Sequence, residues 1–421
     1  IAAEDNNTVS VRGRGFRFDP KQLDRFELTS GGGQHGMSMD DWGRKFVCSN
    51  SVPAQTLMYD DRYIARNPHV QAPPPAIDIA PDGKHTKLFR ISPPEPWRVL
   101  RTRLRRERQF RGPDEGGKPF GFFTAATGIT IYRGDAWPDE YRGNLLVGDV
   151  ANNLMYRALL EPDELQLVAR RADQDVEFLA SSDIWFRPVQ FANAPDGSLY
   201  ILDMYRELIE GAAFLPPEFF EHLDALSGND RGRIYRLVAN DGNPLRKSPR
   251  LDSATTAELV AMLAHPNGWH RDTASRLLYE RQDPTATGPL REILTSSPSP
   301  IGRATALYAL HGLDALDDNS VLIALSDTSP HVRIHALRLA EHVVTESSLV
   351  AAKMIELAED VDKLVRYQAA FSLGSMPGPT AAAALFRIAV LDGEDRWMRV
   401  AILSSVSDLA GTLFQLLASH S

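Results

Sequence analysis

The alternation of apolar and polar residues divides the chain into two parts. Up to about residue 245, short apolar runs separated by glycine-containing turns are typical of antiparallel strands. From Leu251 onward, glycines become rare and apolar residues recur with a period near 3.6, which indicates amphipathic helices. The pattern therefore predicts a β domain over residues 1–245 and a helical domain over residues 251–421.

Three segments of the first part repeat one strand–turn–strand layout. Each has a turn glycine and, six residues later, a polar residue at the end of the second strand: Gly43 and Ser49, Gly143 and Asp149, and Gly197 and Asp203. Such repeated units are typical of β-propeller blades, and a β-sandwich is the alternative. We expect a partial β-propeller of about three blades. Since three blades do not close a ring, we expect the N-terminal blades to be missing from this chain.

An arginine- and proline-rich insertion is expected at residues 68–117, between the first two blades. Its segment from Leu100 to Arg105 alternates apolar or hydroxyl residues with arginines, which predicts one exposed strand. A patch that binds anions or phosphate is the alternative interpretation.

The second part contains arginines at intervals of 30 to 33 residues, each at the start of an apolar helix: Arg271, Arg303, Arg333, Arg366 and Arg399. Helix pairs that repeat at this interval indicate an α-solenoid, here of HEAT type. Asp327 and Asp360 lie six residues before two of these arginines, whereas Gly393 takes that position in the last repeat. We expect Arg333 and Arg366 to meet these carboxylates in their own or adjacent repeats.

Composition excludes several classes of function. A net charge of −9 and a pI near 5.7 argue against a nucleic-acid partner. No run approaches about 18 apolar residues, so we expect no membrane span. The single cysteine, Cys48, cannot form an internal disulfide or a CxxCH haem-attachment site, and its apolar strand predicts a packed rather than reactive thiol.

Several longer segments carry a resemblance to a known family: Ser30–Gln34, Phe46–Ser51, Glu95–Arg103, Gly121–Gly128, Ile184–Asn193 and Asp203–Glu207. Over nearly the whole chain, the sequence resembles the PVC-type membrane-bound dehydrogenases, also called haem-binding CxxCH proteins. The resemblance implies a propeller related to the glucose/sorbosone dehydrogenases that use pyrroloquinoline quinone, then HEAT repeats, then a cytochrome-c-type haem domain. Because this chain has no CxxCH, haem c would belong to a domain missing from it.

The function implied by the resemblance is the oxidation of a sugar or alcohol substrate outside the cytoplasm. Electrons would pass to a cytochrome-type acceptor, and the protein would be periplasmic or associated with the cell envelope. The alternative is a non-catalytic binding or scaffold protein that recognises a glycan or a protein partner.

Candidate site residues lie in the loops that a propeller would open on one face around its axis. The catalytic candidates are His35, Arg187 and Asp203. The candidates for binding the cofactor are Arg187, Arg206, Asn50 and Asn152. Asp149 and Asp203 are the candidate calcium ligands, because calcium takes oxygen ligands.

The shared offset from each turn glycine places these side chains at equivalent ends of equivalent strands. We therefore expect Arg187, Asp149, Asp203 and Arg206 to surround one opening, with His35 at its rim. The alternative is that the aspartates cap turns and hold adjacent strands together.

Overall fold

A computed structural model describes residues 10–20, 22–29, 31–110, 117–210, 215–240, 247–345, 347–376 and 378–420. The chain divides into two compact units. One comprises residues 1–57 and 76–246, and the other comprises residues 58–75 and 247–421. The sequence assigned residues 58–75 to the β part, but the structure groups this segment, called here the inserted loop, with the helices.

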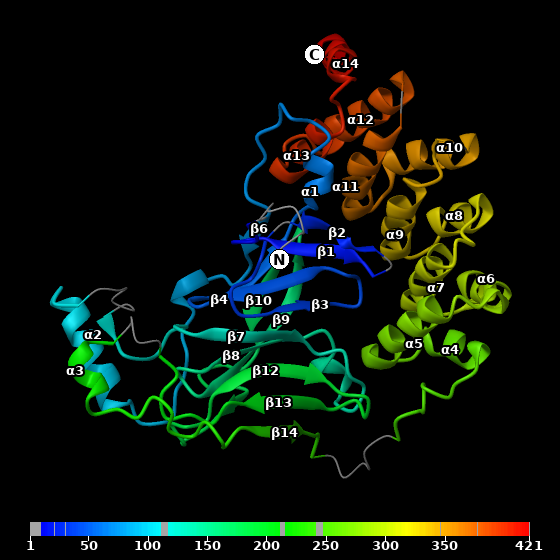
Figure 1. Ribbon diagram of the computed structural model, residues 1–421. Helices are drawn as coiled ribbons and strands as arrows, with labels where there is room; N and C mark the ends of the chain where they lie inside the picture. Colours follow the sequence, from blue (N-terminus) through cyan, green and yellow to red (C-terminus); the bar gives the residue numbers. More distant parts are fainter. Residues whose placement is uncertain are drawn as a thin grey trace. The chain divides into compact units, whose positions relative to one another are not determined.

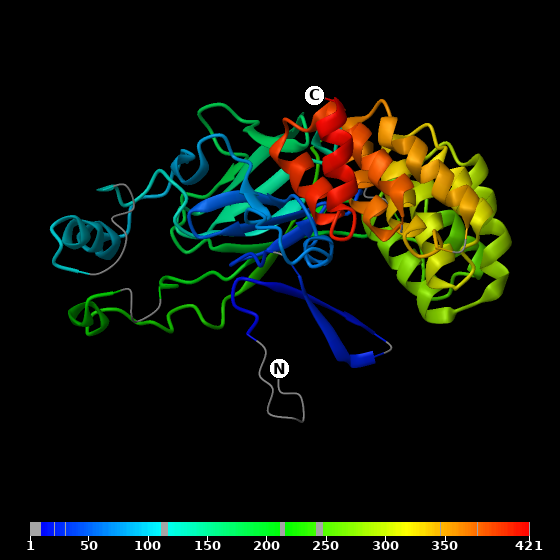
Figure 2. The same cartoon turned by 90° about the horizontal axis from the view of Figure 1, so that it is seen from above.

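The β unit begins with a hairpin of β1 (Gly15–Asp19) and β2 (Gln22–Thr29), which extends away from the sheets that follow (Figure 2). Three antiparallel sheets then follow in chain order (Figure 1). The first contains β3 (Met37–Met39), β4 (Lys45–Ser49), β5 (Val52–Leu57) and β6 (Ala76–Asp78). The second contains β7 (Ala126–Ile131), β8 (Leu145–Asp149), β9 (Leu154–Asp163), β10 (Gln166–Arg171) and β11 (Leu179–Ala180). The third contains β12 (Pro188–Asn193), β13 (Leu199–Asp203) and β14 (Arg233–Leu237).

The repeated strand–turn–strand layout is visible in all three sheets. The turn glycines Gly43, Gly143 and Gly197 have φ angles of +69°, +77° and +82°. A residue with a Cβ rarely adopts this left-handed conformation, which explains glycine at each of the three turns. The strand that follows each glycine, β4, β8 or β13, pairs with a strand on either side.

The middle sheet is buried on both faces. Along β8, Leu145 and Val147 belong to a core cluster shared with Phe46 of the first sheet. Leu146 points the other way, into a cluster with Phe191 of the third sheet. Because both faces are covered, β8 is a continuous apolar run rather than an alternating one.

The predicted exposed strand at residues 100–105 is wrong, because this segment lies in helix α2 (Pro96–Arg106). Pro96 occupies the first turn of the helix, where proline is tolerated. The buried face of α2 carries Arg98, Arg101, Thr102 and Arg105, which share the helical spacing i, i+3, i+4 and i+7. A short helix, α3 (Pro217–Phe220), lies further along the chain, and residues 111–116 of the insertion are outside the described residues.

The helical unit is a series of antiparallel helix pairs, preceded in the sequence by helix α1 (Asp61–Ile64) of the inserted loop. The helices are α4 (Thr256–Met262), α5 (Gly268–Arg281), α6 (Thr287–Ser296), α7 (Pro300–Gly312), α8 (Asp318–Leu325), α9 (Pro330–Ala340), α10 (Ser348–Glu356), α11 (Lys363–Ser372), α12 (Pro379–Asp392), α13 (Arg396–Ser404) and α14 (Ala410–His420). Capping side chains fix several starts: Asn267, Ser299 and Asp362 each accept a hydrogen bond from a backbone N–H in the first turn of α5, α7 or α11.

Three of the repeated arginines, Arg303, Arg333 and Arg366, join successive helix pairs as a ladder. The predicted contact with a turn carboxylate is confirmed for Arg333, whereas Arg366 binds a carboxylate that was not predicted. Arg333 Nη1 donates to the carbonyl of Asp327 in its own repeat, at 2.8 Å, while its Nε and Nη2 bind the carboxylate of Asp360 in the next. Arg366 likewise binds the carbonyl of Asp360 and the carboxylate of Asp392. The ladder therefore continues through Asp392, where the sequence analysis noted only Gly393.

Among the described residues, no helix combines the length and the apolar composition needed to cross a membrane.

Candidate functional site

The two candidate calcium ligands lie at the ends of β8 and β13, where their carboxylates accept backbone hydrogen bonds. Asp149 is completely buried. Its Oδ1 accepts from the N–H groups of Ala151 and Asn152 and from Asn152 Nδ2, and its Oδ2 accepts from the N–H groups of Thr124 and Ala125. The Asp149 carboxylate thus closes the turn after β8 and ties this turn to the loop that precedes β7 in the same sheet.

Asp203 repeats this arrangement in the third sheet with fewer bonds. Its Oδ1 accepts from the N–H groups of Arg187, at 2.7 Å, and Tyr205, at 2.8 Å. Its Oδ2 is buried and has no hydrogen-bond partner among the residues that the structure describes. Tyr205 itself has a φ of +45°, so the turn after β13 is held in an unfavourable conformation for a residue with a side chain.

Arg187 connects the candidate residues of the second and third sheets. Its Nη1 donates to the carbonyl of Val150, next to Asp149, and its Nε donates to the carbonyl of Arg206. Its Nη2 donates to the carbonyl of Glu207 and to Glu95 Oε1, at 2.8 and 3.1 Å. The structure thus brings Arg187, Asp149, Asp203 and Arg206 together, and every guanidinium nitrogen of Arg187 is engaged.

Glu95 is the buried carboxylate at the centre of this arginine cluster. Its Oε2 accepts from Arg90 Nη2 at 3.0 Å, while Arg98 lies close by and donates to the carbonyl of Ala151. Burial alone would raise the pKa of Glu95, but the charges of Arg187, Arg90 and Arg98 lower it below its usual value. Burial lowers the pKa of Arg187, and the charge of Glu95 opposes that effect. The carboxylate therefore stays ionised and holds the arginines in place.

The remaining candidates are divided between buried and exposed positions. Arg206 donates to the carbonyls of Ser227 and Ala225, and Asn152 Nδ2 donates to the carbonyl of Phe122 as well as to Asp149. His35 and Asn50 are exposed on the first sheet. No hydrogen bond within the described ranges joins the His35 side chain to Arg187, so the structure does not connect His35 to the buried cluster.

This arrangement does not fit calcium or the carboxylates of pyrroloquinoline quinone. Calcium needs six to eight oxygen ligands, but N–H groups occupy both oxygens of Asp149, and the described residues contain no group of three side chains suited to a metal. A cofactor carboxylate would need two free and adjacent guanidinium N–H groups, and four of the five N–H groups of Arg187 already donate to carbonyls and Glu95. In this arrangement, the residues stabilise the strand ends.

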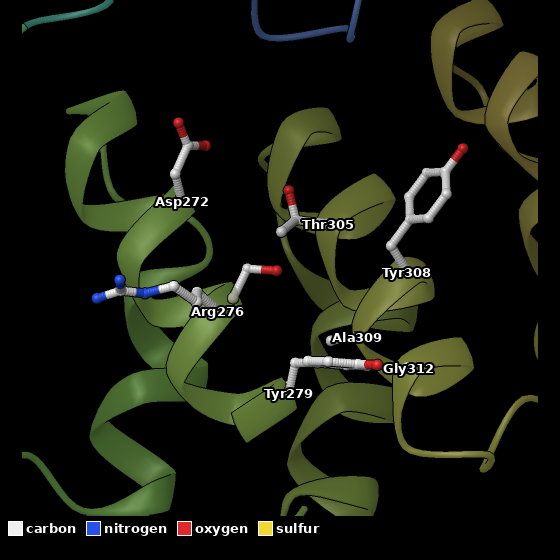
Figure 3. Close-up of a pocket in the computed structure, with 8 residues that line it drawn as sticks. Asp272, Arg276, Tyr279, Thr305, Tyr308, Ala309 and Gly312 are labelled. Atoms are coloured by element: carbon white, nitrogen blue, oxygen red, sulfur yellow. The ribbon is translucent and has the colours of Figure 1, made fainter. Parts of the chain in front are cut away.

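A separate pocket of about 440 Å³ lies in the helical unit between α5 and α7. Its lining residues are Asp272, Ser275, Arg276, Tyr279, Thr305, Tyr308, Ala309 and Gly312. Figure 3 shows the Tyr279 side chain extending from α5 toward Gly312 on α7. A Cβ at Gly312 would lie 3.0 Å from Tyr279 Cδ2, so glycine makes room for the ring. Tyr308 is 37% exposed, and its hydroxyl lies 3.0 Å from His335 Nδ1 on α9.

Comparison with known families assigns the β unit. The sequence profile of a domain of unknown function, DUF7133, matches residues 1–241, which is more than half of the chain. The chain belongs to the DUF7133 family. A HEAT-repeat profile also matches residues 319–407, which supports the helical repeats that follow the DUF7133 region.

The other comparisons add little to the DUF7133 assignment. No curated protein matches this chain. Among solved structures, the chain is similar to an engineered protein studied by the Northeast Structural Genomics Consortium, with 16% identity over 39% of this chain and 90% of that one. The TM-score of that match is 0.26.

Sequence reasoning missed the residues that surround Arg187 and hold its buried cluster together. Glu95, Arg90 and Arg98 all lie within the predicted insertion, which was interpreted as solvated. The available signal was a lone glutamate followed by closely spaced arginines. The pocket between α5 and α7 was also missed, because each helix contributes ordinary polar residues whose proximity depends on how the helices pack.

Proposed function

We propose that this chain is a binding protein and that its helical unit recognises a segment of a partner protein. The observation that carries the proposal is the pocket between α5 and α7, which is lined by Tyr279 and Tyr308 together with the charged side chains of Asp272 and Arg276. Aromatic and arginine side chains contribute strongly to protein recognition, and helical solenoids present extended surfaces of this kind.

A display library of random peptides, selected on the full chain, tests this proposal. Selected peptides should bind at least about tenfold more weakly to Tyr308→Ala, because loss of a central aromatic contact commonly costs more than about 1.4 kcal/mol. Leu349→Ala on α10 is the matched control, since Leu349 is 67% exposed and lies outside the pocket. Failure to enrich any peptide, or equal binding to Tyr308→Ala, would reject the proposal.

The three sheets of the β unit are proposed to be consecutive blades of a β-propeller. The antiparallel sheets follow in chain order, they share the position of the turn glycine, and β7 packs against β4 of the first sheet and β12 of the third. An experimental structure in which successive sheets do not rotate about a common axis would contradict this proposal.

A quinone-dependent dehydrogenase of the cell envelope, with a sugar or alcohol substrate and a cytochrome-type acceptor, is the second proposal. What supports it is the resemblance of the sequence to the PVC-type dehydrogenases, and not the cluster of Arg187, Asp149, Asp203 and Arg206, whose present contacts do not fit the cofactor. Cofactor binding would require Arg187 and Asp149 to give up their present hydrogen bonds. Titration with pyrroloquinoline quinone and calcium, followed by reduction of an artificial acceptor across a sugar and alcohol panel, tests it. Absence of binding would reject this role for the chain.

A further inference from the structure

The inserted loop lies on the helical unit in the way that a bound peptide would. Its base is closed by a hydrogen bond of 3.0 Å from Met58 N to the carbonyl of Pro75. Between these ends, α1 contacts α13, and the Asn67 side chain donates to the carbonyl of Leu403 in α13 at 2.8 Å. The loop also contacts Glu341, which follows α9, and Phe371 in α11. It therefore crosses three successive repeats.

Tyr63 is the central anchor of the inserted loop. It is only 4% exposed, and its ring stacks on Phe371 with centroids 4.6 Å apart and planes 22° apart. Its hydroxyl donates to Glu341 Oε1 at 2.8 Å and accepts from Gln368 Nε2 at 3.0 Å. The solenoid thus contacts the Tyr63 ring through Phe371 and the Tyr63 hydroxyl through Glu341 and Gln368.

Two arginines one helical turn apart complete the contact with Glu341. Arg62 Nη1 and Arg66 Nη2 lie 2.9 and 3.2 Å from Glu341 Oε2. Their guanidinium carbons lie 4.3 and 4.8 Å from the centroid of the Tyr63 ring. Arg66 also donates to the carbonyl of Phe371 and to Ser375 Oγ.

The Glu341 site belongs to the solenoid, whereas its cationic partners belong to the loop. Without the loop, the Glu341 carboxylate would retain the hydrogen bond from Ser372 Oγ, at 2.7 Å, and lose both arginines and the tyrosine. A helix of four residues, such as α1, is not stable by itself in water. Its conformation therefore depends on the solenoid surface, as a peptide ligand's does.

We infer that the surface around Glu341, Phe371 and Leu403 is a recognition site for a helical turn that carries arginine, an aromatic residue and a second arginine at positions i, i+1 and i+4. The inserted loop occupies this site within the chain, and a partner segment of the same chemistry displaces it. This inference rests on the proposed function, because both require the solenoid to bind segments of a partner protein. It concerns a different surface from the pocket between α5 and α7.

The test uses the full chain with a weakened loop, Arg62→Ala combined with Tyr63→Ala. The probe is a labelled peptide of residues 58–75 with its ends joined. A second probe is an alanine-rich helical peptide with arginine, tyrosine and arginine at the same spacing, and its control has glutamine in place of both arginines. The weakened chain should bind both arginine peptides and not the glutamine control. The unmodified chain should bind each at least about tenfold more weakly, because its own loop occupies the site.

Adding Glu341→Gln to the weakened chain should reduce binding at least about tenfold, the effect of losing charge-assisted hydrogen bonds. Thermal unfolding verifies that each variant is folded; if the double variant is not, Arg62→Ala alone takes its place. Binding that is absent, or unchanged by Glu341→Gln, would overturn the inference.

Native mass spectrometry distinguishes a bound peptide from exchange of loops between two copies of the chain. Dimers formed by loop exchange, without any bound peptide, would also overturn the inference. Library peptides that depend on Tyr308 would still bind if only this inference failed.

Discussion

Arg333 and Asp360 form a two-point ion pair between successive repeats, with Nε–Oδ2 and Nη2–Oδ1 distances of 2.7 and 2.8 Å. Arg303 with Asp327, and Arg366 with Asp392, repeat the same geometry. Since Arg333 also donates to the carbonyl of Asp327, one side chain holds its own turn and the next one.

Arg333→Gln should therefore destabilise the helical unit. The pair is largely buried, and hydrogen bonds to charged groups each contribute about 1.5–3 kcal/mol, so we expect a loss of that order. Urea unfolding followed by circular dichroism at 222 nm measures it. Arg276→Gln is the matched control: Arg276 lies 3.6 Å from Glu280 with both side chains exposed, and its loss should change stability by less than about 0.5 kcal/mol. Equal effects of the two substitutions would contradict a structural role for the ladder.

Asp149→Asn should destabilise the β unit by roughly 2–5 kcal/mol. The amide nitrogen that replaces one carboxylate oxygen would face at least two N–H groups, and each buried group left unpaired costs about 1–3 kcal/mol. Fluorescence of the buried Trp137 reports the unfolding of this unit. Asp230→Asn, at an exposed side chain, is the control. An Asp149→Asn protein more stable than the original would instead indicate a strained functional carboxylate.

The stability of the helical unit should fall as the pH falls below about 6.5. The His311 and His342 rings stack with centroids 4.8 Å apart. Burial, and then the charge of His342, lower the pKa of His311 below 6.5, while Asp314 opposes this. Because the unfolded chain binds the proton more readily, this contribution is present above the unfolded pKa and is lost as the pH falls through the folded pKa.

Unfolding of the original chain and of His311→Gln between pH 5.5 and 7.5 measures this contribution. The difference in free energy between the two proteins should decrease toward acidic pH. A difference that is constant across this range would show that His311 does not titrate with folding.

Cys48 should not react with thiol reagents in the folded chain. Burial raises the pKa of its thiol to about 11, and the side chain is fully enclosed in the core of the β unit. Since the thiolate is the reactive form, labelling by a disulfide reagent should require unfolding. Rapid labelling in buffer, at the rate seen in denaturant, would show that the strand opens readily.

Local pattern was sufficient to predict the sheets and the repeats. Gly43, Gly143 and Gly197 mark turns whose conformation glycine favours, and the repeated arginines open successive helices. The rule that buried faces are apolar failed for α2, where Arg98, Arg101 and Arg105 face inward. Arg98 binds the carbonyl of Ala151, and Arg101 binds the carboxylate of Glu210. The ladder carboxylate Asp392 was missed because it lies one residue earlier than the six-residue spacing requires.

The sequence predicted where the candidate residues lie along the strands, but not which groups their side chains bind. Equivalent strand ends placed Asp149 and Asp203 correctly relative to their turns. What each carboxylate binds depends on loops distant in the sequence, such as the Thr124 N–H that reaches Asp149. The inserted loop was assigned to the wrong unit for a similar reason: Tyr63 and Glu341 are 278 residues apart, and no local pattern relates them.

That separation has a consequence for the order of events during synthesis. The ribosome makes Tyr63 before any helix of the solenoid exists, and Asn67 meets its partner in α13 only after 336 further residues. At roughly 5–20 residues per second, the loop waits on the order of 15–60 s for Glu341 to be made. During that interval the nascent chain carries an aromatic side chain between two arginines with no folded surface to cover it. The inserted loop therefore reaches its final conformation only after repeats made much later in the sequence have emerged and folded.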